Sequence, residues 1–132
     1  ADPLVIQALR RTGYDIGMAF QIIDDILDYE SDDKTLRKPV GNDIKEGLCT
    51  LPLILALKKD ESSLRPLLGK PMDDRKISEI LRIVLATGAL DEARSIAQRF
   101  TARARVEIER LPSCPAKQEL MNASEALLQR RY

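Results

Sequence analysis

The sequence predicts an all-α fold, an antiparallel helical bundle with short loops. Strong helix formers dominate the 132 residues, whereas aromatic residues are limited to two Phe and three Tyr, with no Trp. Apolar residues recur at helical spacing, and no stretch alternates in the manner of a strand. The length suits one domain, so we expect a single all-helical segment over residues 1–132.

The first helix is expected over residues 3–30, where apolar side chains recur every three or four positions. Asp2 can cap this helix, and Pro3 suits its first turn. Gly13 and Gly17 lie in its interior, where each costs about 1 kcal/mol relative to alanine. We therefore expect another element to pack closely against these two glycines.

A polar connection over residues 30–43 leads to a second helix, expected over 43–59. Asp43 followed by Glu46 forms a capping-box pattern at its start. Pro52 lies inside this range and should kink the helix.

The rest of the chain should form three more helices, over about 74–87, 90–111 and 116–130. Asp73 or Asp74 can cap the first of them, and Gly88 should end it. Short connections between these helices predict antiparallel neighbours.

Composition excludes several classes of function. Lys plus Arg and Asp plus Glu are equal at 21 each, which gives no indication of a nucleic-acid partner. The absence of histidine excludes zinc sites and histidine-dependent nucleophiles. The longest apolar run, residues 48–57, is too short for a transmembrane segment. Cys49 and Cys114 are interpreted as core residues of a reduced, cytoplasmic protein.

The segment FQIIDDILDY, residues 20–29, places three aspartates among apolar residues. At about 100° per residue, Asp24, Asp25 and Asp28 share one polar stripe of the helix with Gln21. Asp24 and Asp28 form a like-charge pair one turn apart, so a positive partner is expected. The candidates are a basic helix and a divalent cation, and Mg2+ suits a few carboxylates on one face. A solvated acidic face is the alternative, which the flanking apolar residues disfavour.

Residues 20–54, FQIIDDILDYESDDKTLRKPVGNDIKEGLCTLPLI, closely resemble the second aspartate-rich region of the trans-isoprenyl diphosphate synthases, the polyprenyl synthetases. The shared elements are FQ-x-x-DD-x-x-D, an acidic loop, K-P-x-G-x-D and E-G-x-x-T-L-P. Residues 87–104 and 111–131 resemble the C-terminal helices of the family. The resemblance implies the C-terminal half of an isoprenoid-synthase-type fold. It also implies a transferase of isoprenoid biosynthesis that condenses isopentenyl diphosphate with an allylic diphosphate.

The resemblance further implies that Mg2+ is the cofactor. Asp24 should ligate Mg2+ directly, while Asp25 and Asp28 should ligate it or hold its waters. Asp43 should lie near the metal without ligating it, although it could equally serve as a helix cap.

Substrate contacts also follow from the resemblance. Phe20 and Gln21 should contact the allylic substrate, and Gln21 could instead be satisfied within the core. Lys38 should reach the allylic diphosphate and stabilise the charge of the departing pyrophosphate. An ordinary exposed loop lysine is the alternative for Lys38.

The sequence departs from the family pattern in three respects. Members are much longer, and no counterpart of their first aspartate-rich motif is found here. Arg37 and Leu48 stand where glycine and lysine are common. We therefore expect the C-terminal portion of a larger synthase, inactive by itself. The resemblance implies a homo-oligomeric enzyme, with a requirement for a second, different subunit as the alternative. Faces of residues 4–30 and 48–57 should remain apolar and exposed, favouring self-association.

Three other functions are compatible with the motif. A non-catalytic helical regulatory or interaction subunit could retain a degenerate aspartate-rich motif for folding. A helical interaction domain could pair its aspartates with lysines of a partner. Terpene cyclases share the fold, but their second metal motif usually carries Asn and Ser or Thr in place of the second aspartate cluster.

Overall fold

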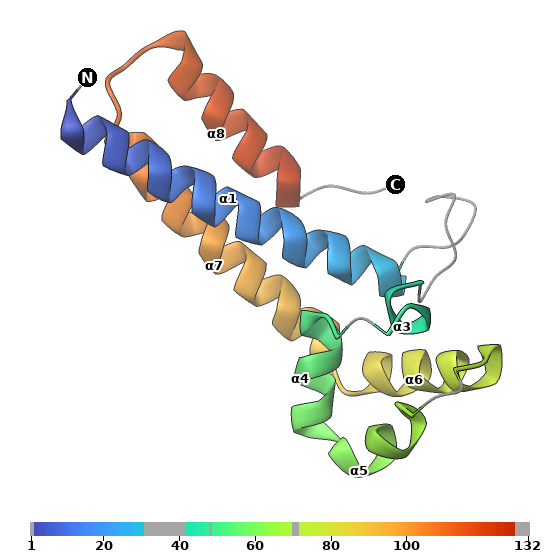
Figure 1. Cartoon of the computed structure of the whole chain (residues 1–132). Helices are drawn as coiled ribbons and strands as arrows, with labels where there is room; N and C mark the ends of the chain where they lie inside the picture. Colours follow the sequence, from blue (N-terminus) through green and yellow to red (C-terminus); the bar gives the residue numbers. More distant parts are fainter. Residues whose placement is uncertain (1, 31–41, 48, 70–71, 129–132) are drawn as a thin grey trace. The chain divides into compact units, whose positions relative to one another are not determined.

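The computed structural model describes residues 2–30, 42–47, 49–69 and 72–128. Within these ranges every regular element is helical, which confirms the predicted all-α class (Figure 1). The chain divides into two compact units. Residues up to 23, together with the chain from residue 95, form the first, and residues 24–94 form the second.

The first unit contains most of the two longest helices, α1 (Pro3–Glu30) and α7 (Ala89–Glu109), and the whole of α8 (Pro115–Leu128). The predicted cap of α1 is confirmed, because a carboxylate oxygen of Asp2 accepts the backbone N–H of Leu4 at 2.9 Å. The bounds of α1 also match the prediction. Those of α7 and α8 agree to within two residues.

Ion pairs define how these helices run. Arg11 pairs with Glu107 at 3.5 Å, and one turn further along α1 Asp15 pairs with Arg103 at 3.6 Å. Residue numbers rise on α1 while they fall on α7, so the two helices are antiparallel, as predicted (Figure 1). A small apolar core fills the space between α1, α7 and α8. Its buried residues are Ala8, Ile108 and Leu111, and the apolar residues packed against them are Val5, Ile16, Leu120 and Met121.

The second unit contains the end of α1, the start of α7 and several shorter helices. These are α3 (Asn42–Lys45), α4 (Leu51–Lys59), α5 (Glu61–Leu64), the 3-10 helix η1 (Arg65–Leu67) and α6 (Asp74–Ala86). Asp73 caps α6 by accepting the backbone N–H of Lys76 at 2.8 Å. Gly88, at φ 78°, follows the end of α6, as predicted.

The predicted helix over 43–59 is wrong in its continuity. Gly47 adopts φ 82°, a left-handed conformation that ends α3, and the chain resumes as α4 only at Leu51. Pro52 lies in the first turn of α4, where its missing N–H costs nothing, so it starts a helix and does not kink one. The α5–η1 turn was not predicted.

The two thiols also differ from the prediction. Cys49 and Cys114 are both free and exposed, so they are not core residues. Each lies just outside a helix, in the residues before α4 and before α8, and the interior is filled by Ile, Leu and Ala instead.

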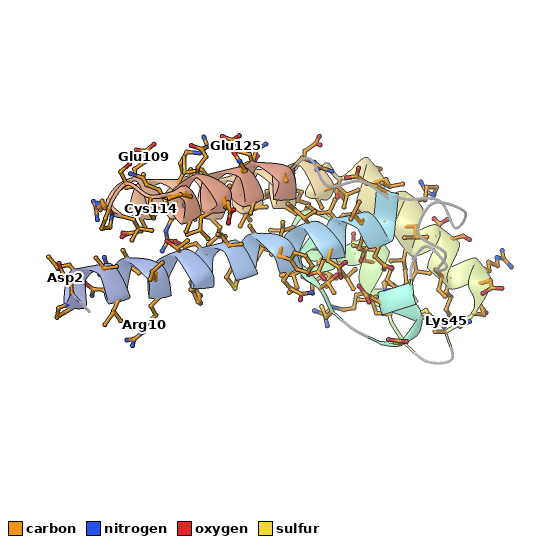
Figure 2. The ribbon with its side chains drawn as sticks, turned by 90° about the horizontal axis from the view of Figure 1, so that it is seen from above. Asp2, Arg10, Lys45, Glu109, Cys114 and Glu125 are labelled. Atoms are coloured by element: carbon orange, nitrogen blue, oxygen red, sulfur yellow. The ribbon has the colours of Figure 1, made fainter. Side chains whose placement is uncertain are left out.

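One face of α1 is open to solvent along its N-terminal two thirds. Ile6, Leu9 and Phe20 are exposed apolar residues on this face. A Cβ added at Gly13 or Gly17 would meet no atom of the described residues within 4 Å, so the close packing expected there is not provided by this part of the chain. Figure 2 shows Arg10, on the same face, pointing away from α8.

The exposed apolar face predicted for residues 4–30 is thus confirmed for the N-terminal two thirds of α1, whereas the apolar residues of its last two turns are buried. In the range 48–57, Ile54 of α4 is exposed, but Leu53 and Leu55 are buried. Among the described residues, no helix is both long and apolar enough to cross a membrane.

Candidate active site

The acidic stripe, which consists of Asp24, Asp25 and Asp28, lies on the last two turns of α1. Apolar side chains on both flanks, at residues 22, 23, 26 and 27, are buried. This burial fixes the rotation of the helix and therefore the direction of the remaining face. Phe20 and Gln21 are exposed one turn before Asp24, which is partly exposed.

The three aspartates of the motif differ in burial. Asp24 is partly exposed, Asp25 is 8% exposed and Asp28 is fully buried. A carboxylate loses its hydration when it is buried, so Asp25 and Asp28 require polar or charged neighbours within the fold. Of the three, Asp24 presents the most accessible oxygens for an added ligand.

The structure brings the end of the motif together with Asp43. The Oδ2 atom of Asp28 accepts the backbone N–H of Asp43 at 3.2 Å, across 15 positions of sequence. Asp43 lies in the first turn of α3, where backbone N–H groups have no acceptor within their own helix. The side chain of Asp43 is itself partly exposed.

Tyr29 was not predicted to belong to the site, although it directly follows the motif. Its side chain is buried at 4% exposure. Burial raises the pKa of Tyr29 well above its usual value near 10. The nearby Thr50 hydroxyl opposes this rise, while the negative charges of Asp28 and Asp43 add to it. Tyr29 therefore remains protonated. Thr50 immediately precedes α4, so the start of this helix lies near Tyr29.

Glu30, the last residue of α1, pairs with Arg94 of α7. This ion pair was not predicted from the sequence, because the two residues are 64 positions apart. It links the helix that carries the aspartates to α7 within the second unit.

Lys38 lies outside the described residues. Among the residues that are described, no three Asp, Glu or Cys side chains converge where they could together hold a metal ion.

The first unit contains a hollow of about 560 Å³. It is lined by Arg10, Arg11, Tyr14, Asp15, Arg103, Val106 and Glu107. Asp15 is buried there and pairs with Arg103. The Arg103 guanidinium lies 5.4 Å from the ring centre of Phe100, a neighbour on the same helix. The ion pair between Asp15 and Arg103 joins α1 and α7 at this hollow.

Sequence comparison matches residues 1–84 to the polyprenyl synthetase family model. An all-trans-nonaprenyl-diphosphate synthase (geranyl-diphosphate specific) of Rhodobacter capsulatus is 39% identical over 94% of this chain and 39% of its own length. Heptaprenyl diphosphate synthase component 2 of Bacillus subtilis is 31% identical over the whole chain and 38% of its own length.

Comparison with solved structures also finds prenyl diphosphate synthases. The heptaprenyl diphosphate synthase of Staphylococcus aureus superposes with a TM-score of 0.91 at 30% identity, over 98% of this chain and 42% of the other. A geranylgeranyl pyrophosphate synthase of Corynebacterium glutamicum, complexed with calcium and isoprenyl diphosphate, gives 0.87 at 34% identity, over 98% and 41%.

The fold is that of isoprenyl diphosphate synthases, in agreement with the predicted C-terminal half of an isoprenoid-synthase-type fold. The chain belongs to the polyprenyl synthetase family. It spans about two fifths of the length of these relatives.

Proposed function

We propose that this chain supplies the second aspartate-rich part of a trans-prenyltransferase active site. The complete enzyme would condense isopentenyl diphosphate with an allylic diphosphate in the presence of Mg2+. The main support is the partly exposed Asp24, which follows the exposed Phe20 and Gln21 by one turn of α1 in a chain of the polyprenyl synthetase family. Phe20 offers an apolar contact, Gln21 an amide and Asp24 a carboxylate along one face of the helix.

The donor chemistry fits Mg2+. Carboxylate oxygens are the hard ligands that this ion takes, and it is commonly held by one or two carboxylates together with waters and substrate phosphates. Asp24 would ligate the ion, and Asp25, which is nearly buried beside it, would hold waters of its coordination shell. The relative from Corynebacterium glutamicum was crystallised with calcium, another divalent cation, and isoprenyl diphosphate.

Bound Mg2+ would neutralise the negative charge that develops on the departing pyrophosphate. Lys38 would donate hydrogen bonds to the same diphosphate and add a positive charge beside it. Phe20 and Gln21 would orient the allylic substrate. The exposed apolar side chain of Phe20 would restrict water near the allylic carbon once the remainder of the fold covers it.

The activity requires the remainder of the synthase fold. We propose that residues 1–132 are one all-helical segment of a larger prenyltransferase domain, because they cover only about two fifths of the matched relatives. The working enzyme would be a homo-oligomer with no nucleic-acid partner. Two free, exposed cysteines fit a reducing, cytoplasmic location.

A chimeric enzyme tests this proposal. The segment of the Rhodobacter capsulatus synthase that matches this chain is replaced by residues 1–132, and incorporation of labelled isopentenyl diphosphate is measured with an allylic diphosphate. We expect Mg2+-dependent product from the chimera and none from the chain alone. Asp24→Asn should lower the rate by at least about 100-fold. The exposed Asp74→Asn is the matched control and should leave it unchanged.

Two outcomes would refute the proposal. One is a folded chimera, verified by circular dichroism, that forms no product. The other is a chimera in which Asp24→Asn and Asp74→Asn have equal rates.

A further inference from the structure

The third aspartate of the motif differs from the first in its environment. Asp24 is partly exposed on the open face of α1, whereas Asp28, one turn later, has no exposed surface. A side chain with no exposed surface is poorly placed to share a hydrated Mg2+ ion, which usually keeps several of its waters. Equal roles for the two carboxylates are therefore not supported by their burial.

One contact of Asp28 is with the backbone of α3. Its Oδ2 accepts the N–H of Asp43 at 3.2 Å. That N–H is in the first turn of α3 and has no intrahelical acceptor, so Asp28 satisfies a donor that would otherwise need water. A carboxylate makes a stronger acceptor for such a group than a neutral oxygen does.

Other buried groups hold the same segment in place. Ile44, next to Asp43 on α3, is 2% exposed, and Tyr29, next to Asp28, is also buried. Thr50, which precedes α4, is near enough to the Tyr29 hydroxyl to affect its acidity. Asp28 thus contacts α3 directly, and Tyr29 lies near Thr50, which follows α3 in the chain.

We propose that Asp28 is a positioning residue, whose carboxylate fixes the backbone of α3 and thereby the Asp43 carboxylate beside the metal-binding end of α1, and that it does not ligate Mg2+. Its functional consequence rests on the proposed prenyltransferase function. The structural part, that Asp28 holds α3, stands independently of that function.

Amide hydrogen exchange, measured by NMR on the whole chain, tests the structural part. Asp28→Ala removes the acceptor and should speed exchange at the Asp43 amide by at least about tenfold. Asp28→Asn keeps an oxygen acceptor and should stay within about threefold of the wild type, as should Asp24→Asn. Asp60→Ala is the matched control. Asp60 accepts the N–H of Ser63 at 3.3 Å, so its removal should affect Ser63 and leave Asp43 unchanged.

Calorimetric titration with Mg2+ and inorganic pyrophosphate tests the functional part. We expect Asp24→Asn to weaken binding by at least about tenfold and Asp28→Asn to change it by less than about threefold. This comparison uses two substitutions of the same kind, and it remains valid even where Asp28→Ala fails to fold. Equal losses in the two Asn variants would overturn the proposal, because they would make Asp28 a ligand.

An Asp43 amide that exchanges at the same rate in wild type and Asp28→Ala would overturn it as well. A wild-type chain that binds no Mg2+ and pyrophosphate would count against the proposed function. The exchange measurement would then still decide whether Asp28 holds α3.

Discussion

The open face of α1 leads to a testable prediction about the stability of the chain. Gly13 and Gly17 lie inside a 28-residue helix, where glycine is normally unfavourable. Neither has the positive φ that characterises Gly47 and Gly88, and both have free space at the position of an added Cβ among the described residues. Replacing both by alanine should therefore stabilise this chain.

The magnitude follows from helix propensity alone. Each Gly→Ala change in an exposed helix interior contributes about 1 kcal/mol, so the double variant should gain about 2 kcal/mol in free energy of unfolding. For a domain of this size the gain corresponds to a rise in Tm of roughly 6 °C. No contact needs to form, since the gain comes from a more restricted unfolded chain and a better helix.

Urea unfolding followed by circular dichroism provides the assay, supported by sedimentation to verify the oligomeric state. Gly88→Ala is the matched control. Its φ of 78° is strained for a residue with a Cβ, so this variant should lose about 1 kcal/mol. A double variant at Gly13 and Gly17 that is destabilised would refute the reasoning, because a side chain or a second copy would then occupy the face that is open here.

Three other changes test the packing and charges of the second unit. Ile26→Ala should lower the free energy of unfolding by about 2–5 kcal/mol, measured in urea, because Ile26 is fully buried; a loss below 1 kcal/mol would contradict its core position. Burial raises the pKa of Tyr29 in the folded protein. The neutral hydroxyl therefore makes its full contribution to stability below the pKa of the unfolded chain, near 10. This contribution is lost as the pH rises from there towards the pKa of the folded state. Between pH 10 and 11 the wild type should lose up to about 1.4 kcal/mol more than Tyr29→Phe, and parallel pH profiles would exclude this cause. Glu30→Gln removes a partly exposed ion pair with Arg94 and should cost no more than about 1 kcal/mol, which thermal melts at low and high salt can measure.

Much of the fold was predictable because its helix ends carry local signals. Asp2 and Asp73 cap α1 and α6 through contacts with residues two or three positions ahead, and Gly88 marks the end of α6 with a left-handed turn. The prediction over 43–59 failed because two local rules competed. A capping box and apolar spacing favoured one helix, while Gly47 ended it and Pro52 started another.

The site was predictable only as far as the helix itself. Periodicity placed the aspartates on one stripe, and the motif order indicated their family. The amide of Asp43 on α3 reaches Asp28 across 15 positions of sequence, and no local pattern encodes that contact or the unequal burial of Asp24 and Asp28. The same holds for Tyr29, because its environment is formed by Asp43 and Thr50 after the chain folds back.

Asp24 is the proposed carboxylate that binds the cation of a departing pyrophosphate. Crystals of the chain grown with Mg2+ and pyrophosphate test this directly. We predict a metal ion about 2.1 Å from an Asp24 carboxylate oxygen, with pyrophosphate oxygens completing its coordination and Asp28 still bonded to the backbone of Asp43. Pyrophosphate bound elsewhere on the chain, with no metal at Asp24, would contradict it.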